Sequence, residues 1–489
     1  MKYEEKGIGA MIKVGLLIDN QELLTENLME VKDPGRLDEV IGYVAQGTSE
    51  HVDQAVKSAH RAFQLWRCTS VQDRVALLES IATKLEKEAD KLASLISREN
   101  GMTYLTTKSE IKLALAAIRN ICEIAENSLK PKQMEDETGW VHIEKKPMGV
   151  IAGIVPWNAP IVLTMQKLVP AIISGNTIVI KPSPFAAIGV TECLKIITEL
   201  LPSGVVNVVH GDREVGEALT NHRLVRKISF TGGGKTAISV MKAAANSLKN
   251  VHFELGGNDP AIILDDVNID EAMQKIVDGV FRRSGQFCFA IKRIYVPESI
   301  YDRFFEKMCK VTDQFKIGHQ LNEETTFGPL NNEQQYENVK AIVEKVEASS
   351  AKIVRLGQKL EPEQWNNGYY LQPAIVRDVH SEDDIVTGEQ FGPVIPLIPY
   401  QSIDDAIELA NSTEYGLGSS VWSSNIERAL EVANKIEAGL TFINGNGQTS
   451  LGHKEIPFGG VKQSGIGREN SEVVFGEYIE YHGINLHKE

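Results

Sequence analysis

The run Gly149-Val150-Ile151-Ala152-Gly153-Ile154-Val155, continued by Pro156-Trp157-Asn158-Ala159-Pro160, decides the fold that we expect for this chain. It reads as a short apolar strand, rich in β-branched residues, that ends in a proline-bounded turn. Comparable runs follow at 176–180, 204–209, 227–230 and 260–264, and helical stretches such as 190–201 and 235–248 separate most of them. This alternation predicts an α/β fold with a parallel sheet and with ligands at the carboxyl ends of the strands. A second α/β region is expected from about residue 255 to about residue 455.

The segments on either side of this region have patterns of their own. Residues 1–50 predict short strands and turns. Three amphipathic helices are expected next, over 52–66, 70–101 and 107–129, the second with an N-cap at Ser70 and a stop at Gly101. Polar, alternating residues at 130–147 indicate an exposed ribbon that leaves its domain. Residues 473–485 alternate again, which is typical of a strand and favours pairing with another subunit.

Length and composition narrow the classes of function. A chain of 489 residues is too long for one ordinary core, so two or three domains are expected. The formal net charge of −15 argues against nucleic acid or an anionic membrane as the main partner. The five cysteines form no CxxC pair, and the eleven histidines show no spacing typical of metal ligands. With no apolar segment at 1–6, these features predict a soluble, cytoplasmic protein without a metal.

Cys288 is the first candidate for chemistry, in the stretch Ser284-Gly285-Gln286-Phe287-Cys288-Phe289-Ala290. The Ser-Gly pair lets the backbone bend sharply, and the two phenylalanines would keep water away from the thiol. A nucleophile that a substrate can reach and a small buried hydrophobe are both compatible with this context. The remaining cysteines are interpreted as structural.

Three further candidates stand at strand ends or turns: Asn158, Lys181 and Glu254. Asn158, held between prolines, suits a donor to an oxyanion, or else it caps its own turn. Lys181 suits a ribose-binding role, or else it is a solvated loop lysine. Glu254 lies between apolar neighbours, which predicts a raised pKa and a general base, or else it is a surface glutamate before a turn.

The glycine-rich turn Phe230-Thr231-Gly232-Gly233-Gly234-Lys235-Thr236 leads from a strand into a helix. Glycines at this place allow a diphosphate to approach the free N–H groups at a helix N-terminus. The turn is similar to the end of a Walker A loop, but the first glycine of that motif would fall at Ser229. A P-loop is therefore excluded.

In their order along the chain, these motifs resemble the aldehyde dehydrogenase superfamily. The separation of Glu254 and Cys288 (288 − 254 = 34) is also that of the family. The resemblance extends through Glu389-Gln390-Phe391-Gly392-Pro393, Pro457-Phe458-Gly459-Gly460 and Ser464-Gly465, and spans nearly the whole chain, from Asp33-Pro34 to Gly465-Ile466-Gly467-Arg468-Glu469. The tetrapeptide Ala290-Ile291-Lys292-Arg293 is similar to a bacterial branch of the superfamily.

The resemblance implies a mechanism and its catalytic residues. Cys288 would attack an aldehyde to give a thiohemiacetal, whose oxyanion the Asn158 side chain and the Cys288 N–H would hold. Hydride transfer to the nicotinamide would leave a thioester. Glu254 would activate the water that hydrolyses it, and Lys167 would help to relay the proton. The product is a carboxylic acid.

The resemblance also implies cofactor contacts and domains. Lys181 and Glu389 would hold ribose hydroxyls, Phe391 would lie against the nicotinamide, and Gly232 and Gly233 would lie beside the diphosphate. Further contacts are implied for Ile154, Pro156, Trp157, Ser183 and Leu255. A Rossmann-like cofactor domain would comprise 1–128 and 148–254, an α/β catalytic domain 255–456, and an oligomerisation ribbon 129–147 and 471–489. A homodimer or homotetramer is expected.

Several positions depart from the family pattern. Pro184 stands where many NAD-preferring members carry an acid, so NAD is expected with NADP as an alternative. Gly233 and Ala237 replace a common serine and glycine. Arg282-Arg283 replaces an aromatic-Asn pair, which suits either a bound carboxylate or an ion pair. Ala159 in place of a frequent aromatic predicts a wider tunnel. With Phe287, Phe289 and Gln448 as wall residues, the expected substrate is a medium-sized or aromatic aldehyde.

Two rival functions remain at this point. In a CoA-acylating dehydrogenase, CoA takes the acyl group in place of water, and Glu254 argues against it because such enzymes generally lack that base. A non-enzymatic protein that has kept the fold is the other rival. The presence of Asn158, Glu254 and Cys288 together argues against it.

Overall fold

The computed structural model describes residues 11–488, and the run at 149–155 lies in the middle of an eight-stranded sheet. The sheet has the order β22-β12-β11-β8-β9-β10-β2-β3. Its central strands, from β12 to β10, are parallel, which confirms the expected α/β class. The strands are β2 (Leu16–Ile18), β3 (Gln21–Leu23), β8 (Val150–Ile154), β9 (Thr177–Lys181), β10 (Val206–Val208), β11 (Val225–Thr231), β12 (Asn250–Glu254) and β22 (Gly465–Ile466).

The order of the parallel strands changes direction between β8 and β11. From β8 the chain proceeds to β9 and β10 on one side, and β11 is followed by β12 on the other. At such a switch point the loops that leave the carboxyl ends diverge and open a crevice for a ligand. The loops that follow Ile154 and Thr231 flank this point, so the proline-bounded turn and the glycine-rich turn come to one edge of the sheet.

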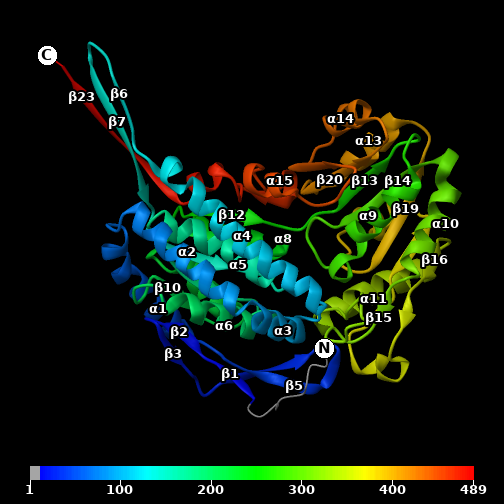
Figure 1. Cartoon of the computed structure of the whole chain (residues 1–489), viewed down its shortest axis with the longest axis horizontal. Coiled ribbons are helices and arrows are strands. Elements are labelled where there is room, and N and C mark those ends of the chain that lie inside the picture. Colours follow the sequence, from blue (N-terminus) through cyan, green and yellow to red (C-terminus); the bar gives the residue numbers. More distant parts are fainter. Residues whose placement is uncertain (1–10, 489) are drawn as a thin grey trace.

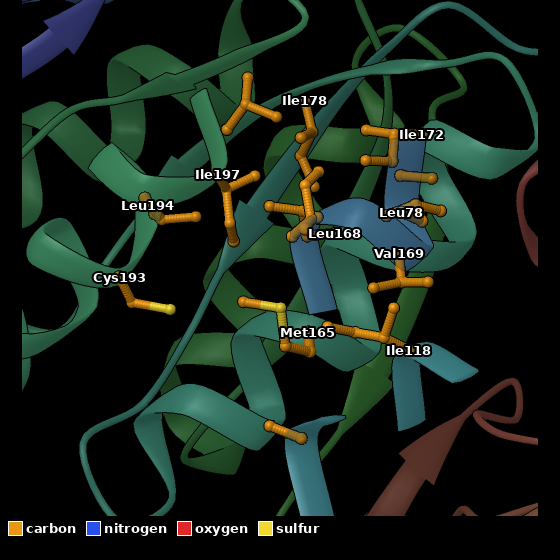
Figure 2. Close-up of a cluster of buried hydrophobic side chains, with 14 of the residues drawn as sticks. Leu78, Ile118, Met165, Leu168, Val169, Ile172, Ile178, Cys193, Leu194 and Ile197 are labelled. Atoms are coloured by element: carbon orange, nitrogen blue, oxygen red, sulfur yellow. The ribbon is translucent and has the colours of Figure 1, made fainter. Parts of the chain in front are cut away.

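Helices cover both faces of this sheet and bury two separate cores. One face carries α2 (Val71–Lys87), α3 (Ala89–Asn100), α4 (Tyr104–Leu129), α5 (Pro160–Ile173) and α6 (Ala187–Thr198), and the other carries α1 (Ser49–Trp66), α7 (Arg213–Asn221) and α8 (Gly234–Ala245). Alternate residues of β9 divide between the cores, with Ile178 in the first and Val179 in the second. Figure 2 shows part of the first core, where Leu168 of α5 and Ile197 of α6 gather near Ile178.

One expected helix is two helices in the structure. Ser70 is the N-cap, and its hydroxyl accepts a hydrogen bond from the Asp73 N–H at 3.1 Å. Gly101 ends the segment in the left-handed region at φ 85°. Between them Glu88 leaves the helical region, at φ −96° and ψ 4°, and separates α2 from α3. Both apolar stripes still reach the same core because the break lets α3 change direction.

A second sheet of seven strands forms from residue 259 onward, as expected for a second α/β region. Its order is β16-β18-β19-β14-β13-β20-β21, and only β16 is antiparallel to its neighbour among these strands. The run at 260–264 is β13 and belongs here. The strands are β13 (Asp259–Ile263), β14 (Ile291–Pro297), β16 (Lys352–Arg355), β18 (Ala374–Arg377), β19 (Val394–Tyr400), β20 (Gly418–Trp422) and β21 (Leu440–Ile443). The helices are α9 (Ile269–Phe281), α10 (Tyr301–Thr312), α11 (Glu333–Glu347), α12 (Asp384–Thr387), α13 (Ile403–Asn411), α14 (Ile426–Ala433) and α15 (Ser450–Glu455).

A three-stranded ribbon projects from the body of the molecule (Figure 1). It joins β6 (Lys132–Glu135) and β7 (Gly139–Pro147) to β23 (Ile479–His487), with β7 in the middle. The strand expected over 473–485 is partly wrong, because 472–477 form a short helical turn that buries Val474 and Phe475 in the first core. The strand begins only at Ile479, and its partner is β7 of the same chain.

The short strands expected at the start of the chain are present in the part that the structure describes, and residues 1–10 lie outside it. They include β1 (Ile12–Val14), β4 (Leu28–Asp33) and β5 (Arg36–Ala45), which form a small sheet; β15 (Lys316–Ile317) and β17 (Gln358–Lys359) pair elsewhere. Among residues 11–488, no helix combines the length and the apolar character needed to cross a membrane.

Candidate active site

A cavity of about 570 Å³ lies at the carboxyl ends of β8, β11 and β12, and the second α/β region closes it. This volume is typical of a site for a small molecule or a cofactor. Ten of the sequence-predicted site residues line it: Pro156, Trp157, Asn158, Gly232, Gly233, Glu254, Leu255, Cys288, Glu389 and Phe391. Ile154, Lys167, Lys181 and Ser183 lie outside its lining. Polar residues of α11, including Gln335, Asn338 and Lys345, also line it and were not predicted, because their helix shows only an ordinary amphipathic pattern.

Cys288 is delivered to the cavity by a tightly bent segment. The expected bend is confirmed: Arg283, Ser284 and Gly285 have φ values of 55°, 55° and 75°. Such values are costly for residues other than glycine, so the surrounding structure must hold them in place. The Ser284 hydroxyl donates to the Gly328 carbonyl at 2.8 Å and fixes the bend against the neighbouring loop.

The Cys288 side chain is half-buried and faces the cavity, so it is not a core residue. Burial raises the pKa of the thiol to about 12, although the positive charge of Lys292 acts in the opposite direction. The Lys292 ammonium donates to the Cys288 carbonyl at 2.6 Å. At neutral pH the thiol is therefore protonated, and a positive charge already lies beside the place where a thiolate would form.

Asn158 lines the cavity at the end of the loop that follows β8. Its side chain does not cap its own turn, since no hydrogen bond involves its amide anywhere in residues 11–488. Its carbonyl accepts from Arg283 at 2.6 Å, and Arg283 lies 3.2 Å from the buried carboxylate of Glu110. Glu110 in turn accepts from the Ile161 N–H at 2.8 Å. These contacts fix the Asn158 backbone to the cysteine segment and leave its amide available to a ligand.

Glu254 is the last residue of β12 and is 3% exposed, which excludes the surface alternative. Neither carboxyl oxygen has a hydrogen-bond partner among the described residues. Burial raises the pKa of Glu254 well above its ordinary value, and the negative charge of Glu469 adds to the shift. The raised pKa expected from the sequence is thus confirmed. The Nε2 atom of His252 lies 3.5 Å from Oε1 of Glu254.

Lys167 lies beneath the cavity as half of a fully buried ion pair. Its ammonium is 2.9 Å from Oε1 of Glu469, and both side chains are at most 1% exposed. The positive charge of Lys167 lowers the pKa of Glu254, against the larger effect of burial. Glu469 and His252 belong to this buried group, and sequence reasoning gave neither of them a role.

The glycine-rich turn leaves the start of α8 open toward the cavity. A side chain at Gly233 or Gly234 would meet no atom within 4 Å, so the free N–H groups of the helix N-terminus are accessible. Glu389 accepts from the Gly257 N–H at 3.2 Å, and the rings of Trp157 and Phe391 meet edge to face at 5.5 Å. An open helix N-terminus beside aromatic rings and a carboxylate fits a dinucleotide.

Ile154 and Lys181 are paired neighbours at the ends of β8 and β9, and Ser183 follows Lys181 by two residues. Lys181 ends β9 in register with Ile154, and it is 8% exposed, so it is not a solvated loop lysine. Burial lowers the pKa of its ammonium to about 8, and Asp212 acts in the opposite direction. The Ser183 hydroxyl accepts from the Phe185 N–H at 3.3 Å, which places Pro184 in a short helical turn.

The two arginines before Cys288 have different environments. Arg283 forms the ion pair with Glu110, one of the alternatives left open by the sequence. The guanidinium carbon of Arg282 lies 4.7 Å from the centre of the Phe287 ring and 5.9 Å from that of Phe289. Within residues 11–488, Arg282 has neither an ion pair within 4 Å nor a hydrogen bond.

The chain is similar to known proteins over nearly its whole length. Residues 21–484 match the model of the aldehyde dehydrogenase family. The chain is 34% identical over 443 residues to alpha-ketoglutaric semialdehyde dehydrogenase of Bacillus subtilis (strain 168), with 90% of each protein covered. It is also 34% identical over 475 residues to aminoaldehyde dehydrogenase 2 of Solanum lycopersicum, with 95% of this chain and 93% of the relative covered.

Solved structures agree with these relatives. Betaine aldehyde dehydrogenase of Staphylococcus aureus in complex with NAD+ matches with a TM-score of 0.92 at 29% identity, over 96% of this chain and 94% of that one. An NADP-dependent enzyme of E. coli matches with a TM-score of 0.92 at 30% identity, over 97% and 98% of the two chains. The fold of both α/β regions is therefore shared with these proteins.

Proposed function

The chain belongs to the aldehyde dehydrogenase family and oxidises an aldehyde to a carboxylic acid with a nicotinamide cofactor, and we propose that Cys288, Asn158 and Glu254 carry out this reaction. One observation supports the assignment most strongly. A single cavity receives a thiol, an amide available for donation and a buried carboxyl whose oxygens have no partner. A nucleophile, an oxyanion donor and a base are the three groups that acyl chemistry on a cysteine needs.

The proposed reaction converts an aldehyde, NAD+ and water to a carboxylate, NADH and two protons. The Cys288 sulfur bonds to the carbonyl carbon as the thiol proton leaves, and the π electrons move to the carbonyl oxygen. The Asn158 side chain and the Cys288 N–H donate to that oxyanion. Bound NAD+ supplies the hydride acceptor, so that the carbon becomes a thioester. Glu254 then takes a proton from the water that attacks the thioester, and the sulfur leaves.

We assign the cofactor to the open edge of the first sheet. Gly232 and Gly233 would face the diphosphate at the start of α8, and Glu389 would hold a ribose with Phe391 against the nicotinamide. Ile154, Pro156, Trp157, Lys181, Ser183 and Leu255 complete the proposed contacts. NAD+ is the cofactor that we propose, with NADP+ as an alternative, because the solved relatives include both an NAD+ complex and an NADP-dependent enzyme. Pro184 offers no acid to repel a 2′-phosphate.

Hydrolysis is favoured over transfer to CoA because Glu254 is present and has a raised pKa. NADH absorbance with a panel of aldehydes, each run with NAD+ or NADP+ and with or without CoA, tests the choice. Turnover that does not require CoA is expected. Glu254→Gln should give a burst of NADH followed by slow deacylation, and Cys288→Ala should give neither. Turnover only with CoA, or an active Cys288→Ala variant, would contradict the assignment.

We also propose that 1–128 and 148–254 bind the cofactor, that 255–456 carry the nucleophile, and that the ribbon of 129–147 and 471–489 joins subunits into a dimer or a tetramer. The ribbon supports this because β6 and β23 are its open edges. A chain cut after residue 478, which loses β23 but keeps the buried Val474 and Phe475, should elute as a monomer from a sizing column. The free state of all five cysteines favours a cytoplasmic location.

A further inference from the structure

We infer that the aldehyde oxidised here carries a carboxylate at the end remote from its carbonyl, and that Arg282 binds this carboxylate. The inference rests on the proposed function, since it concerns the substrate of the same cysteine. The juxtaposition that carries it is an unpaired guanidinium over the ring of Phe287, next to Cys288, together with the Gln448 Nε2 donor, which lacks an acceptor. Such a group has the geometry to fix one end of a substrate while Cys288 attacks the other.

Arg282 lies at the surface of the molecule, six residues before Cys288. Its side chain is exposed to solvent, yet surrounding protein lowers the pKa of the guanidinium to about 10, and the charge of Arg283 adds to the shift. Open space lies beside the guanidinium, because a Cβ at Gly447 would meet no other atom within 4 Å, and we call this space the recess. The thiol of Cys288 contributes to the same electrostatic environment, so the recess and the nucleophile are neighbours.

The Arg282 guanidinium has no acceptor from the described residues, whereas the two other arginines near Cys288 each have at least one. Arg293, on the strand that follows Cys288, donates to the Asn258 carbonyl at 3.0 Å and to the Tyr295 hydroxyl at 2.9 Å, among other acceptors. Arg283 has Glu110. The negative charge of Asp278 influences Arg282, but within residues 11–488 no carboxylate lies within 4 Å of it. Five N–H donors in a planar fork remain for a ligand.

Two residues of the segment after β21 add to the same recess. A side chain at Gly447 would meet only Arg282, whose Nη1 atom is 3.9 Å away, so the glycine leaves space beside the guanidinium. The next residue, Gln448, has a buried Nε2 atom without any acceptor. His453 lies close enough for Arg282 to help burial lower its pKa, which keeps the imidazole neutral. The recess thus offers one full positive charge and additional neutral donors.

These features favour a carboxylate over other anions and over a cation. One guanidinium and neutral donors match a single negative charge, whereas a phosphate dianion would call for a second free cation. A positively charged aldehyde would be repelled by Arg282. Between the recess and the thiol, the rings of Phe287 and Phe289, 5.2 Å apart, provide an apolar wall for the carbon chain or ring that joins the two ends.

Matched pairs of aldehydes test the inference by steady-state NADH formation. Succinic semialdehyde is compared with butanal, and 4-carboxybenzaldehyde with 4-methylbenzaldehyde. We expect the wild type to prefer the charged member in kcat/KM, through KM, because the contact is remote from the reacting atoms. Arg282→Gln should reduce this preference by about 10- to 150-fold, the worth of a charge-assisted contact. The preference of Arg282→Lys should lie between that of the wild type and that of Arg282→Gln. Arg282→Glu should reverse the preference.

Arg303→Gln serves as the matched control, because it removes a positive charge from an exposed helix of the same domain. It should leave the preference unchanged. Equal kcat/KM for charged and neutral members in the wild type would overturn the inference. An equal fall for both members in Arg282→Gln would do so too, because it would show that the guanidinium only packs against Phe287.

A failure of the proposed function would be distinguishable from a failure of this inference. In the first case no aldehyde of either kind would be turned over. Alkylation of the Cys288 thiol by iodoacetamide then decides the carboxylate site without catalysis. Glutarate should slow the alkylation of the wild type, and Arg282→Gln should abolish this protection. Protection that is absent in the wild type, or that persists in Arg282→Gln, would overturn the inference.

Discussion

Replacing Lys167 by methionine removes one half of the buried ion pair beneath the cavity. The ammonium of Lys167 and the carboxylate of Glu469 are 2.9 Å apart and almost without solvent. Loss of the ammonium leaves the Glu469 carboxylate without its cation. The negative charge of Glu469 then repels Glu254, whose oxygens already lack partners, with no positive charge of Lys167 to offset it. Breaking a buried pair in this way typically costs about 3–5 kcal/mol. For a domain of roughly 200 residues this corresponds to a fall in Tm of about 6–20 °C.

The loss should depend on pH, and the pKa of Glu254 fixes the direction. Burial raises this pKa in the folded state, and Lys167 partly offsets the rise, so Lys167→Met raises it further. A carboxyl with a raised folded-state pKa adds stability that is present below its unfolded-state pKa, about 4.3, and that is lost as the pH rises through the folded-state pKa. The methionine variant should therefore lose more stability at about pH 8.5 than at about pH 5.5.

Thermal unfolding of the full chain, followed by tryptophan fluorescence at one protein concentration, measures this loss. The double variant Lys167→Met/Glu469→Gln is the matched control, because it removes both charges and should recover most of the Tm. Glu469→Gln alone should cost less than Lys167→Met, since Lys167 then still has Glu254 as a partner. A fall of less than about 2 °C in Lys167→Met, or an equal fall at both pH values, would refute the reasoning.

Three shorter predictions follow from other buried groups. Burial raises the pKa of Glu99 to about 7, so the folded state should lose about 3 kcal/mol of stability as the pH rises from about 4.5 through 7. Glu99→Gln should therefore flatten the curve of Tm against pH. Parallel curves for the wild type and the variant would contradict this. Gly285→Ala should lower kcat by about 100-fold by displacing Cys288, since a Cβ there collides with the Gly392 carbonyl; unchanged kcat would contradict the clash. Gly256→Ala should weaken NAD+ binding about 10- to 100-fold in titration calorimetry, because the added Cβ would displace the Glu389 carboxylate. The Tm should change little. An unchanged Kd would contradict the role proposed for Glu389.

Local patterns in the sequence predict the architecture well, because they report which side chains the backbone must bury. The β-branched run at 149–155 becomes β8 at the centre of the larger sheet, and the alternation that follows places its neighbours in parallel. The loops at the carboxyl ends then meet at the switch point, which brings Asn158 and Glu254 to one cavity. The bend before Cys288 could also be predicted, because the Ser284-Gly285 pair permits it.

The rest depends on contacts between distant parts of the chain. Lys167 and Glu469 are 302 residues apart, and neither has neighbours that mark it as half of an ion pair. Glu110 lies on a helix whose pattern indicates only packing, although it holds Arg283. Local pattern also missed the break at Glu88, because the apolar stripe continues across it, and the alternation at 473–478 proved to be a helical turn that serves the core.

The charges around the cavity form a consistent scheme in a chain whose net charge is −15. Lys292 lies beside Cys288 and opposes the rise in the pKa of the thiol, and Lys167 does the same for Glu254. Neither ammonium lines the cavity, so each can favour the anionic form of a reacting group without blocking the substrate. Arg282 differs because its guanidinium has no anion of the protein to serve. Since the other two cations each act on a specific anion, the arrangement favours a third anion at Arg282. The cofactor diphosphate is assigned to the start of α8, so we assign this third anion to the substrate.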